Sequence, residues 1–207
     1  MPAGVSDYFY PLGKPAEYQG IVLHHTAGYL KGDLATLVKT GSHVCVPYVV
    51  ARDGNIYRLF DESKYWAYHL GPGSVGGNAE MSKRTIAIEM SNIGQLSLSG
   101  DSLLTGYGDK YCGLDEKQFY SQPPTEFRGS RYYASYTDAQ VESVGALVKY
   151  LCAKYGIPCQ LLDGGKMYQT FSSDAEARAW RGISSHINYR ATGKTDVGPA
   201  FKWETFF

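Results

Sequence analysis

Residues 20–28 form a short β-rich run that ends in polar side chains: Gly20-Ile21-Val22-Leu23-His24-His25-Thr26-Ala27-Gly28. Such a run is typical of a buried strand whose carboxyl end presents side chains to a site. Because neighbouring residues of a strand point to opposite faces, at most one of the two histidines faces any one site. We therefore predict a buried strand that delivers a single histidine to the site.

A second group of polar residues lies near the other end of the chain, where His186 is followed ten residues later by Asp196. If the fold brings these two residues to His24, two imidazoles and a carboxylate form a three-ligand site with an open fourth position. That arrangement is typical of a hydrolytic zinc centre. A single histidine is more often an ordinary polar residue, so spacing alone leaves both interpretations open.

The composition favours one folded domain over residues 1–207, since 43% of the residues are hydrophobic. The formal net charge is +0 and there is no polybasic run, so neither nucleic acid nor an anionic membrane is an expected partner. The chain contains no 18-residue apolar run, and its first residues lack the pattern of a signal peptide. We expect a monomer that is made in the cytoplasm.

The four cysteines form no CxxC pair and therefore indicate neither a zinc ribbon nor a redox motif. The sequence leaves their disulfide state open. Cys152 falls on the apolar face of a predicted helix, so we expect a buried thiol there.

The clearest predicted helix covers residues 138–155, with Thr137 and Gln140 as a capping box and with Gly156 and Pro158 as its stop. Asp53-Gly54 between two β-rich runs predicts a hairpin with a type I′ turn. We expect further helices at 33–39 and 174–181, and strands at 21–25, 48–52, 55–60 and 85–90. This alternation favours a single α/β domain in which helices flank a central mixed β-sheet.

Two segments lack a clear hydrophobic period. Residues 1–19 are interpreted as an extended N-terminal arm. Residues 96–136 are rich in Gly, Tyr, Ser and Pro and are interpreted as a long, loop-like insert. Long ordered loops beside a site are commonly functional, so we expect this insert to form one wall of a groove.

Five segments follow one another in a diagnostic order: Leu23-His24-His25-Thr26-Ala27-Gly28, Val49-Val50-Ala51-Arg52-Asp53-Gly54-Asn55-Ile56-Tyr57, Ala67-Tyr68-His69-Leu70-Gly71, Thr85-Ile86-Ala87-Ile88-Glu89-Met90, and His186 followed by Lys194-Thr195-Asp196-Val197-Gly198-Pro199-Ala200-Phe201. Together they resemble the zinc-dependent N-acetylmuramoyl-L-alanine amidases, which include phage lysozymes with amidase activity and peptidoglycan recognition proteins. The resemblance covers roughly residues 20–95 and 137–203, and it leaves the insert uncovered.

The resemblance implies a hydrolase that cleaves the amide between N-acetylmuramic acid and L-alanine of peptidoglycan, with Zn²⁺ as its cofactor. It implies that the zinc ligands are His24, His186 and Asp196. It further implies that Glu89 is the general base, that Lys194 stabilises the oxyanion and that Tyr57 polarises the substrate. Roles in substrate binding or packing are expected for His25, His69 and Arg190.

Two departures from the family pattern concern substrate preference rather than the ligand set. Pro47 stands where the family often has histidine, and residues 188–193 replace a segment of small residues. We expect a phage endolysin that acts on the cell wall. The alternatives are a cytoplasmic amidase that recycles soluble anhydro-muropeptides and a non-catalytic peptidoglycan-binding module, although a complete ligand set argues against the latter.

Overall fold

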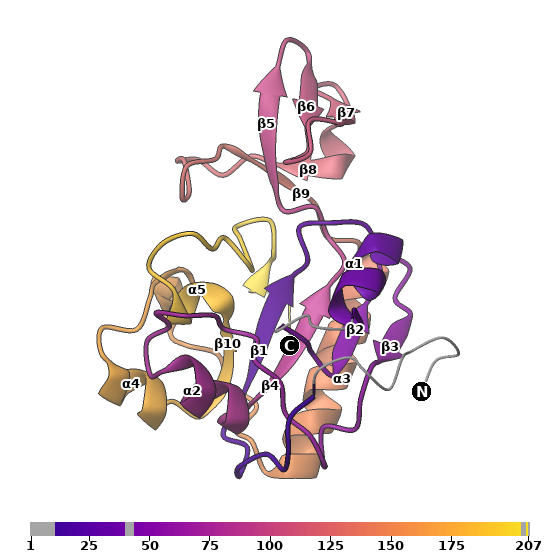
Figure 1. The fold of residues 1–207 in the computed structure, drawn as a ribbon. Coiled ribbons are helices and arrows are strands. Elements are labelled where there is room, and N and C mark those ends of the chain that lie inside the picture. Colours follow the sequence, from indigo (N-terminus) through magenta and orange to yellow (C-terminus); the bar gives the residue numbers. More distant parts are fainter. Residues whose placement is uncertain (1–10, 40–43, 204–205, 207) are drawn as a thin grey trace.

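The central feature of the fold is a five-stranded sheet with the order β10-β1-β4-β2-β3 (Figure 1). The computed structural model describes residues 11–39, 44–203 and 206. Strands β10, β1, β4 and β2 run parallel to one another, and β3 pairs antiparallel to β2. The predicted mixed sheet is therefore confirmed. Its strands are β1 (Gly20–His25), β2 (Tyr48–Val50), β3 (Ile56–Arg58), β4 (Thr85–Met90) and β10 (Gly182–Ser185).

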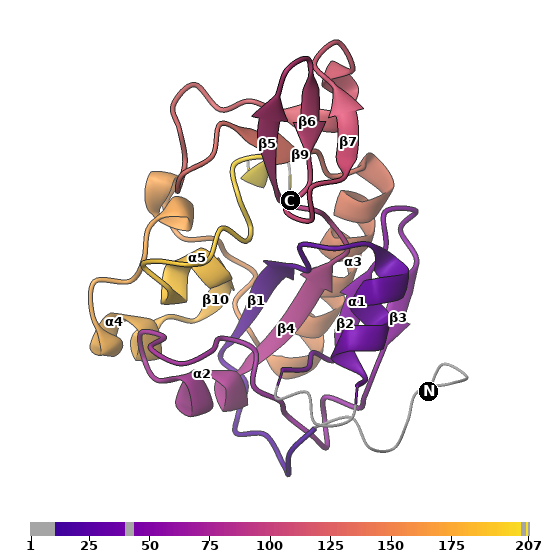
Figure 2. The ribbon, with the colours of Figure 1, turned by 45° about the horizontal axis from the view of Figure 1, so that its top comes forward.

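Helices cover both faces of this sheet, as the α/β prediction requires (Figures 1 and 2). The long helix α3 packs one apolar stripe against the strands, and α1 packs against β2 on the other face with a smaller cluster around Val49. No helix in the described ranges is long and apolar enough to cross a membrane. The helices are α1 (Leu30–Leu37), α2 (Asn78–Arg84), α3 (Asp138–Tyr155), α4 (Asp174–Ala179) and α5 (His186–Tyr189), with 3₁₀ turns at Lys117–Phe119 and Gly164–Tyr168.

Helix α3 has the predicted bounds but only half of the predicted capping box. The Thr137 side chain accepts a hydrogen bond from the backbone N–H of Gln140, and Gly156 ends the helix in the left-handed conformation. The Gln140 amide, however, donates to the backbone oxygens of Val50 and Ser91. Buried carbonyls at the ends of β2 and β4 need a donor, and that need outweighs the reciprocal cap.

The predicted hairpin at Asp53-Gly54 is present, but its turn is longer than predicted. The backbone N–H of Ala51 donates to the oxygen of Asn55, so the loop spans more than two residues. Gly54 has a φ of 87° whereas Asp53 does not adopt positive φ, which excludes a type I′ turn.

The sequence analysis predicted a loop-like insert, and this prediction is wrong. The insert forms a second five-stranded antiparallel sheet with the order β7-β6-β5-β9-β8. Its strands are too short to produce a visible hydrophobic period, and they bury a small core around Leu103 and Cys112. Both views draw it beyond the carboxyl ends of β1 and β4 (Figures 1 and 2). Its strands are β5 (Gln95–Ser99), β6 (Ser102–Leu104), β7 (Lys110–Gly113), β8 (Tyr120–Ser121) and β9 (Tyr132–Ala134).

All four cysteines are thiols in the structure, and Cys152 is buried on α3 as expected. The N-terminal arm is described only from residue 11, and residues 11–19 contain no helix or long strand. Residues 1–10 of the predicted arm lie outside the described residues.

A buried carboxylate ties the region after β3 to the end of α3. Glu62 is fully buried and accepts hydrogen bonds from Arg58, Tyr48, Lys154 and Tyr155 at 2.6–2.8 Å. Burial alone would raise its pKa, but these donors outweigh burial and lower the pKa from 4.5 to about 2.

We predict that Glu62→Gln destabilises the fold above pH 5 by on the order of 3 kcal/mol, the energy that corresponds to this pKa shift. Because the folded-state pKa is depressed, the stabilisation is present above the unfolded pKa and is lost as the pH falls toward 2. Urea unfolding at a series of pH values measures this, with Glu142→Gln on the exposed face of α3 as the control. A destabilisation that is independent of pH would contradict the ionic interpretation.

Candidate metal centre and cleft

The two predicted ligand histidines lie at the same edge of the sheet because their strands are parallel neighbours. Leu23 of β1 pairs with Ser185 of β10, so His24 and His186 follow directly at the carboxyl ends. His186 is the first residue of α5. The Asn188 side chain fixes the start of this helix, because its oxygen accepts a hydrogen bond from the Ser185 backbone N–H. Its amide group donates to three backbone carbonyls within residues 166–169.

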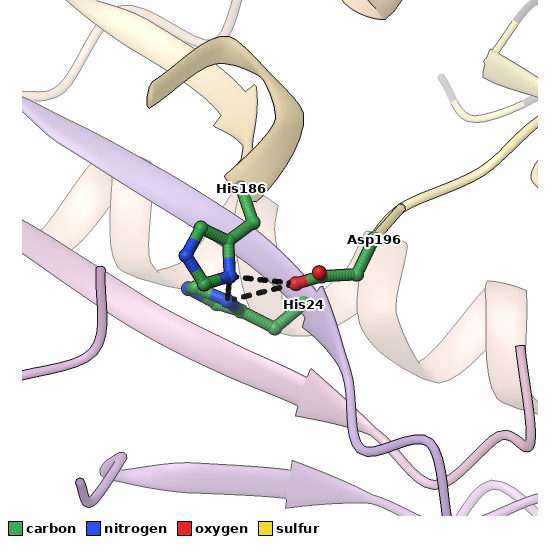
Figure 3. A group of neighbouring side chains, drawn as sticks. All are labelled: His24, His186 and Asp196. Carbon is green, nitrogen blue, oxygen red and sulfur yellow. Dashed lines mark hydrogen bonds and ion pairs between the residues drawn. The ribbon is translucent and has the colours of Figure 1, made fainter. Parts of the chain in front are cut away.

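Asp196 reaches these two histidines from the loop that follows α5 (Figure 3). His186 Nδ1 lies 2.8 Å and His24 Nδ1 lies 3.2 Å from Asp196 Oδ2, and the two Nδ1 atoms are 2.9 Å apart. Ligand atoms bound tetrahedrally to one ion at about 2.0 Å lie about 3.3 Å from each other. The three side chains therefore need only small shifts to hold a metal ion. All three are buried.

His25 points to the other face of the sheet, as strand geometry requires. Its Nδ1 lies 3.1 Å from the hydroxyl of Tyr136, on the side of the sheet that α3 covers. Its side chain also lines the cleft described below. His25 is thus separated from the three ligand atoms but remains beside the site.

The ring of His186 is held in the tautomer that a metal ligand needs. Its Nε2 lies 2.8 Å from the backbone oxygen of Leu70. A carbonyl oxygen can only accept, so Nε2 carries the proton and the neutral ring keeps a lone pair on Nδ1. Arg190 donates to the same Leu70 oxygen at 3.4 Å. Arg190 therefore supports this carbonyl and does not line the cleft.

The ring of His24 is oriented by a chain of three hydrogen bonds. Thr85 Oγ1 donates its only proton to the Met81 carbonyl at 2.7 Å, so it must accept from His69 Nε2 at 3.1 Å. His69 Nδ1 is then an acceptor, and it receives the proton of His24 Nε2 at 3.1 Å. The neutral ring of His24 consequently has its lone pair on Nδ1, toward His186 and Asp196.

The electrostatics of the site agree with the neutral ring inferred for His24. Burial, followed by the proximity of His186, lowers the pKa of His24 to about 4, which keeps its ring neutral at pH 7. Burial raises the pKa of Asp196, but His186 and His24 outweigh it and hold the pKa well below its ordinary value. Two imidazole nitrogens and one carboxylate oxygen are a donor set that suits a divalent transition metal.

Glu89 is the next residue along the same face of the sheet. It pairs in register with His24, so the two side chains leave neighbouring strands about 4.8 Å apart. Its Oε2 atom is buried and has no hydrogen-bond partner among the described residues. Burial first, and the charge of Asp196 second, raise the pKa of Glu89 well above its ordinary value. A buried carboxyl group with a raised pKa, beside a candidate metal site, is a candidate for proton transfer.

The loop that carries Lys194 and Asp196 is fixed to the insert by Arg128. The Arg128 guanidinium donates to the carbonyls of Lys194 at 2.6 Å and of Arg190 at 2.7 Å, and to Thr170 Oγ1 at 3.2 Å. The backbone N–H of Ile187 also donates to the backbone carbonyl oxygen of Asp196 at 2.9 Å. The insert therefore positions one ligand of the site.

Tyr57 lies on the same face of the sheet but far from the ligands. The register runs from His24 to Glu89, Val49 and Tyr57 on successive strands, which separates the first and last by about 14 Å. Tyr57 packs against the cluster under α1. The predicted role in polarising the substrate does not fit this position, because β3 is the edge strand of the sheet.

A cleft of about 720 Å³ opens above the ligands. Its lining includes His186, Asp196, His69 and Glu89 at the site itself and Lys194 on the loop that Arg128 holds. Residues on both sides of the insert's base, Gln95 and Tyr107, also line it. The expectation that the insert contributes to one wall of the groove agrees with this lining.

A family model described as N-acetylmuramoyl-L-alanine amidase matches residues 14–199, which is most of the chain. The chain belongs to this amidase family. The prediction that the chain belongs to a family of N-acetylmuramoyl-L-alanine amidases is thereby confirmed. Comparison with curated proteins finds no match.

Solved structures of amidases share the fold at low sequence identity. The N-acetylmuramyl-L-alanine amidase AmiD from E. coli, solved with an anhydro-muramyl tripeptide substrate, is 21% identical with a TM-score of 0.58 over 93% of this chain and 57% of its own. AmpDh3 from Pseudomonas aeruginosa, in complex with anhydromuramic pentapeptide, is 15% identical with a TM-score of 0.57 over 100% of this chain and 64% of its own. The amidase LysC from Clostridium intestinale is 17% identical, with a TM-score of 0.52 over 97% of this chain and 90% of its own. The chain thus spans less than two thirds of the length of AmiD and AmpDh3.

Sequence reasoning missed the residues that hold the ligands in place. Thr85 and Arg128 act through contacts between segments far apart in the chain, and no local pattern marks them. Asn188, two residues after His186, could have been recognised as the polar residue that fixes the start of a short helix.

We predict that His69→Leu weakens binding of a divalent metal ion 10- to 100-fold, because His24 loses the acceptor that fixes its tautomer. His69→Gln keeps an acceptor oxygen and should bind more tightly than His69→Leu. Titration with Co²⁺ against a chromogenic chelator measures the affinity. His25→Leu, on the other face of the sheet, is the control and should bind as the wild type does. Equal losses in His69→Leu and His25→Leu would contradict the hydrogen-bond chain.

Proposed function

We propose that this member of the amidase family is a zinc hydrolase that cleaves the amide between N-acetylmuramic acid and L-alanine of peptidoglycan. The observation that carries the proposal is the convergence of two Nδ1 atoms and one carboxylate oxygen, each with its lone pair free, at the floor of an open cleft. His24, His186 and Asp196 would hold the zinc ion. When bound there, zinc supplies Lewis-acid chemistry at an amide carbonyl.

Glu89 would move the proton that hydrolysis requires. The attacking water forms a bond to the carbonyl carbon and releases one proton, which Glu89 Oε2 accepts. The same proton then passes to the nitrogen of L-alanine as the carbon–nitrogen bond breaks, so that the leaving group departs as an amine. The unpartnered Oε2 and the raised pKa of Glu89 support this role.

Lys194 would stabilise the negative charge that develops on the carbonyl oxygen. It is the only lysine or arginine among the described residues that line the cleft, and Arg128 fixes its backbone. A cation held near a developing oxyanion lowers the barrier because its position is set before the reaction begins.

The substrate that we propose contains both a glycan strand and a stem peptide. AmiD and AmpDh3, whose folds resemble this one, are described in complex with anhydro-muramyl peptides. The exposed side chains of Tyr29 and Tyr107 at the cleft leave it accessible to a polymer. Because the cleft is open to a polymer, we favour insoluble peptidoglycan over a small recycled muropeptide, and we propose the setting of a phage endolysin and a monomeric enzyme.

The test is the release of L-alanine amino groups from purified sacculi. We predict release by the zinc-loaded protein, loss of release after chelation with recovery on adding Zn²⁺, and a loss of at least about 10³-fold in His186→Ala. Unchanged release by His186→Ala would exclude the metal mechanism. Hydrolysis of soluble anhydro-muropeptide without hydrolysis of sacculi would select a recycling amidase, and zinc binding without hydrolysis of either would select a binding module.

We also predict that Glu89→Gln reduces kcat about 10²- to 10⁴-fold while it retains the metal, because the amide cannot accept the proton. Metal content and kcat measured on the same preparation separate these effects. A variant that keeps kcat within a few-fold of the wild type would exclude Glu89 as the proton acceptor.

A further inference from the structure

The turn between β6 and β7 brings one side chain of the insert onto the cleft. The Tyr107 hydroxyl donates to the backbone oxygen of Ala27 at 3.0 Å, across 80 residues of sequence. Ala27 follows the ligand His24 by three residues at the end of β1. This turn, at the base of the insert, is thereby attached to the segment that directly follows the strand with the proposed metal ligand.

The turn itself is well ordered by its own hydrogen bonds. The Thr105 N–H donates to the oxygen of Asp109 at 2.8 Å, and the Gly108 N–H donates to the oxygen of Thr105 at 3.0 Å. The Tyr107 N–H donates to Thr105 Oγ1 at 3.1 Å. The flanking strands bury Leu103 and Cys112 in the insert's core. Tyr107 is therefore presented on a stable support, with its backbone and its hydroxyl both fixed.

Although the hydroxyl is bonded, the Tyr107 ring remains open to solvent. Tyr107 is 69% exposed, and Tyr29, which also lines the cleft, is 52% exposed. An aromatic ring that is fixed in position and left uncovered has a free apolar face and loses little entropy when a ligand stacks on it. Tyr29 adds a second exposed ring to the same cleft, and together the two rings indicate a binding surface.

The charges in the cleft favour a neutral ligand at these rings. The lining residues that surround Tyr29 in the sequence include the uncharged Gly28, Gly32 and Thr36, and Asp33 accepts hydrogen bonds from Thr26 and Ser91. The cation of the cleft, Lys194, lies on another segment. An uncharged pyranose ring, which offers an apolar C–H face, matches the tyrosines.

We propose that Tyr107 and Tyr29 form a sugar-binding subsite in which an N-acetylhexosamine ring of the glycan strand stacks on the tyrosine rings. This inference rests on the proposed function, since it assigns one part of the proposed substrate to one part of the cleft. It also gives the insert a role in recognition that the family resemblance does not cover.

The test compares Tyr107→Phe with Tyr107→Leu, because both lack the hydroxyl and only one retains the ring. Binding of the N-acetylglucosamine tetramer to the metal-free protein is measured by calorimetry, which requires no catalysis. Tyr107→Leu should weaken binding about 5- to 10-fold relative to Tyr107→Phe, the effect of one ring-stacking contact. Tyr150→Leu is the matched control, since Tyr150 is 57% exposed on α3 and does not line the cleft.

Relative to Tyr107→Phe, Tyr107→Leu should raise KM on sacculi and leave kcat unchanged, because the ring does not touch the reacting atoms. The proposal is overturned if the wild type does not bind the tetramer, if Tyr107→Leu and Tyr107→Phe bind it equally, or if Tyr150→Leu loses as much affinity. Weaker binding of a free stem peptide, with tetramer binding unchanged, would also overturn it. If the protein binds the tetramer but does not hydrolyse sacculi, the proposed hydrolysis fails while the subsite stands.

Discussion

The buried convergence of three lone pairs is the constraint on which the site depends. His24 Nδ1, His186 Nδ1 and Asp196 Oδ2 lie 2.8–3.2 Å from one another, away from water. The hydrogen bonds on the far sides of both imidazoles leave these atoms without protons, so a cation is the group that best satisfies all three at once. The parallel pairing of β1 with β10 and the Arg128 contacts to the Lys194 loop both hold this geometry.

The hydrogen-bond chain from Met81 to His24 links the sheet to the site. Thr85 begins β4, the strand that also carries Glu89, and His69 lies between Thr85 and His24. One strand therefore orients a ligand through its first residue and supplies the candidate proton acceptor through its fifth. Such coupling explains how His69 can influence the metal site without being one of its ligands.

The sequence predicted those features that depend on local order along the chain. The bounds of α3, the mixed sheet and the opposite directions of His24 and His25 follow from periodicity and strand alternation. The features that it missed depend on contacts between distant segments. The Gln140 side chain points inward because buried backbone carbonyls accept hydrogen bonds from its amide. The strands of the insert are too short to show a hydrophobic period. The distance of Tyr57 from the ligands becomes clear only when β3 is known to be the edge strand.

Diffraction above and below the zinc absorption edge, from crystals grown with Zn²⁺, tests the central claim most directly. We expect one anomalous peak at about 2.0–2.2 Å from His24 Nδ1, His186 Nδ1 and an Asp196 carboxylate oxygen. The Nε2 atoms of both histidines should keep their bonds to His69 and to the Leu70 carbonyl. A zinc ion bound through either Nε2 atom, or bound only elsewhere on the protein, would contradict this assignment of the metal centre.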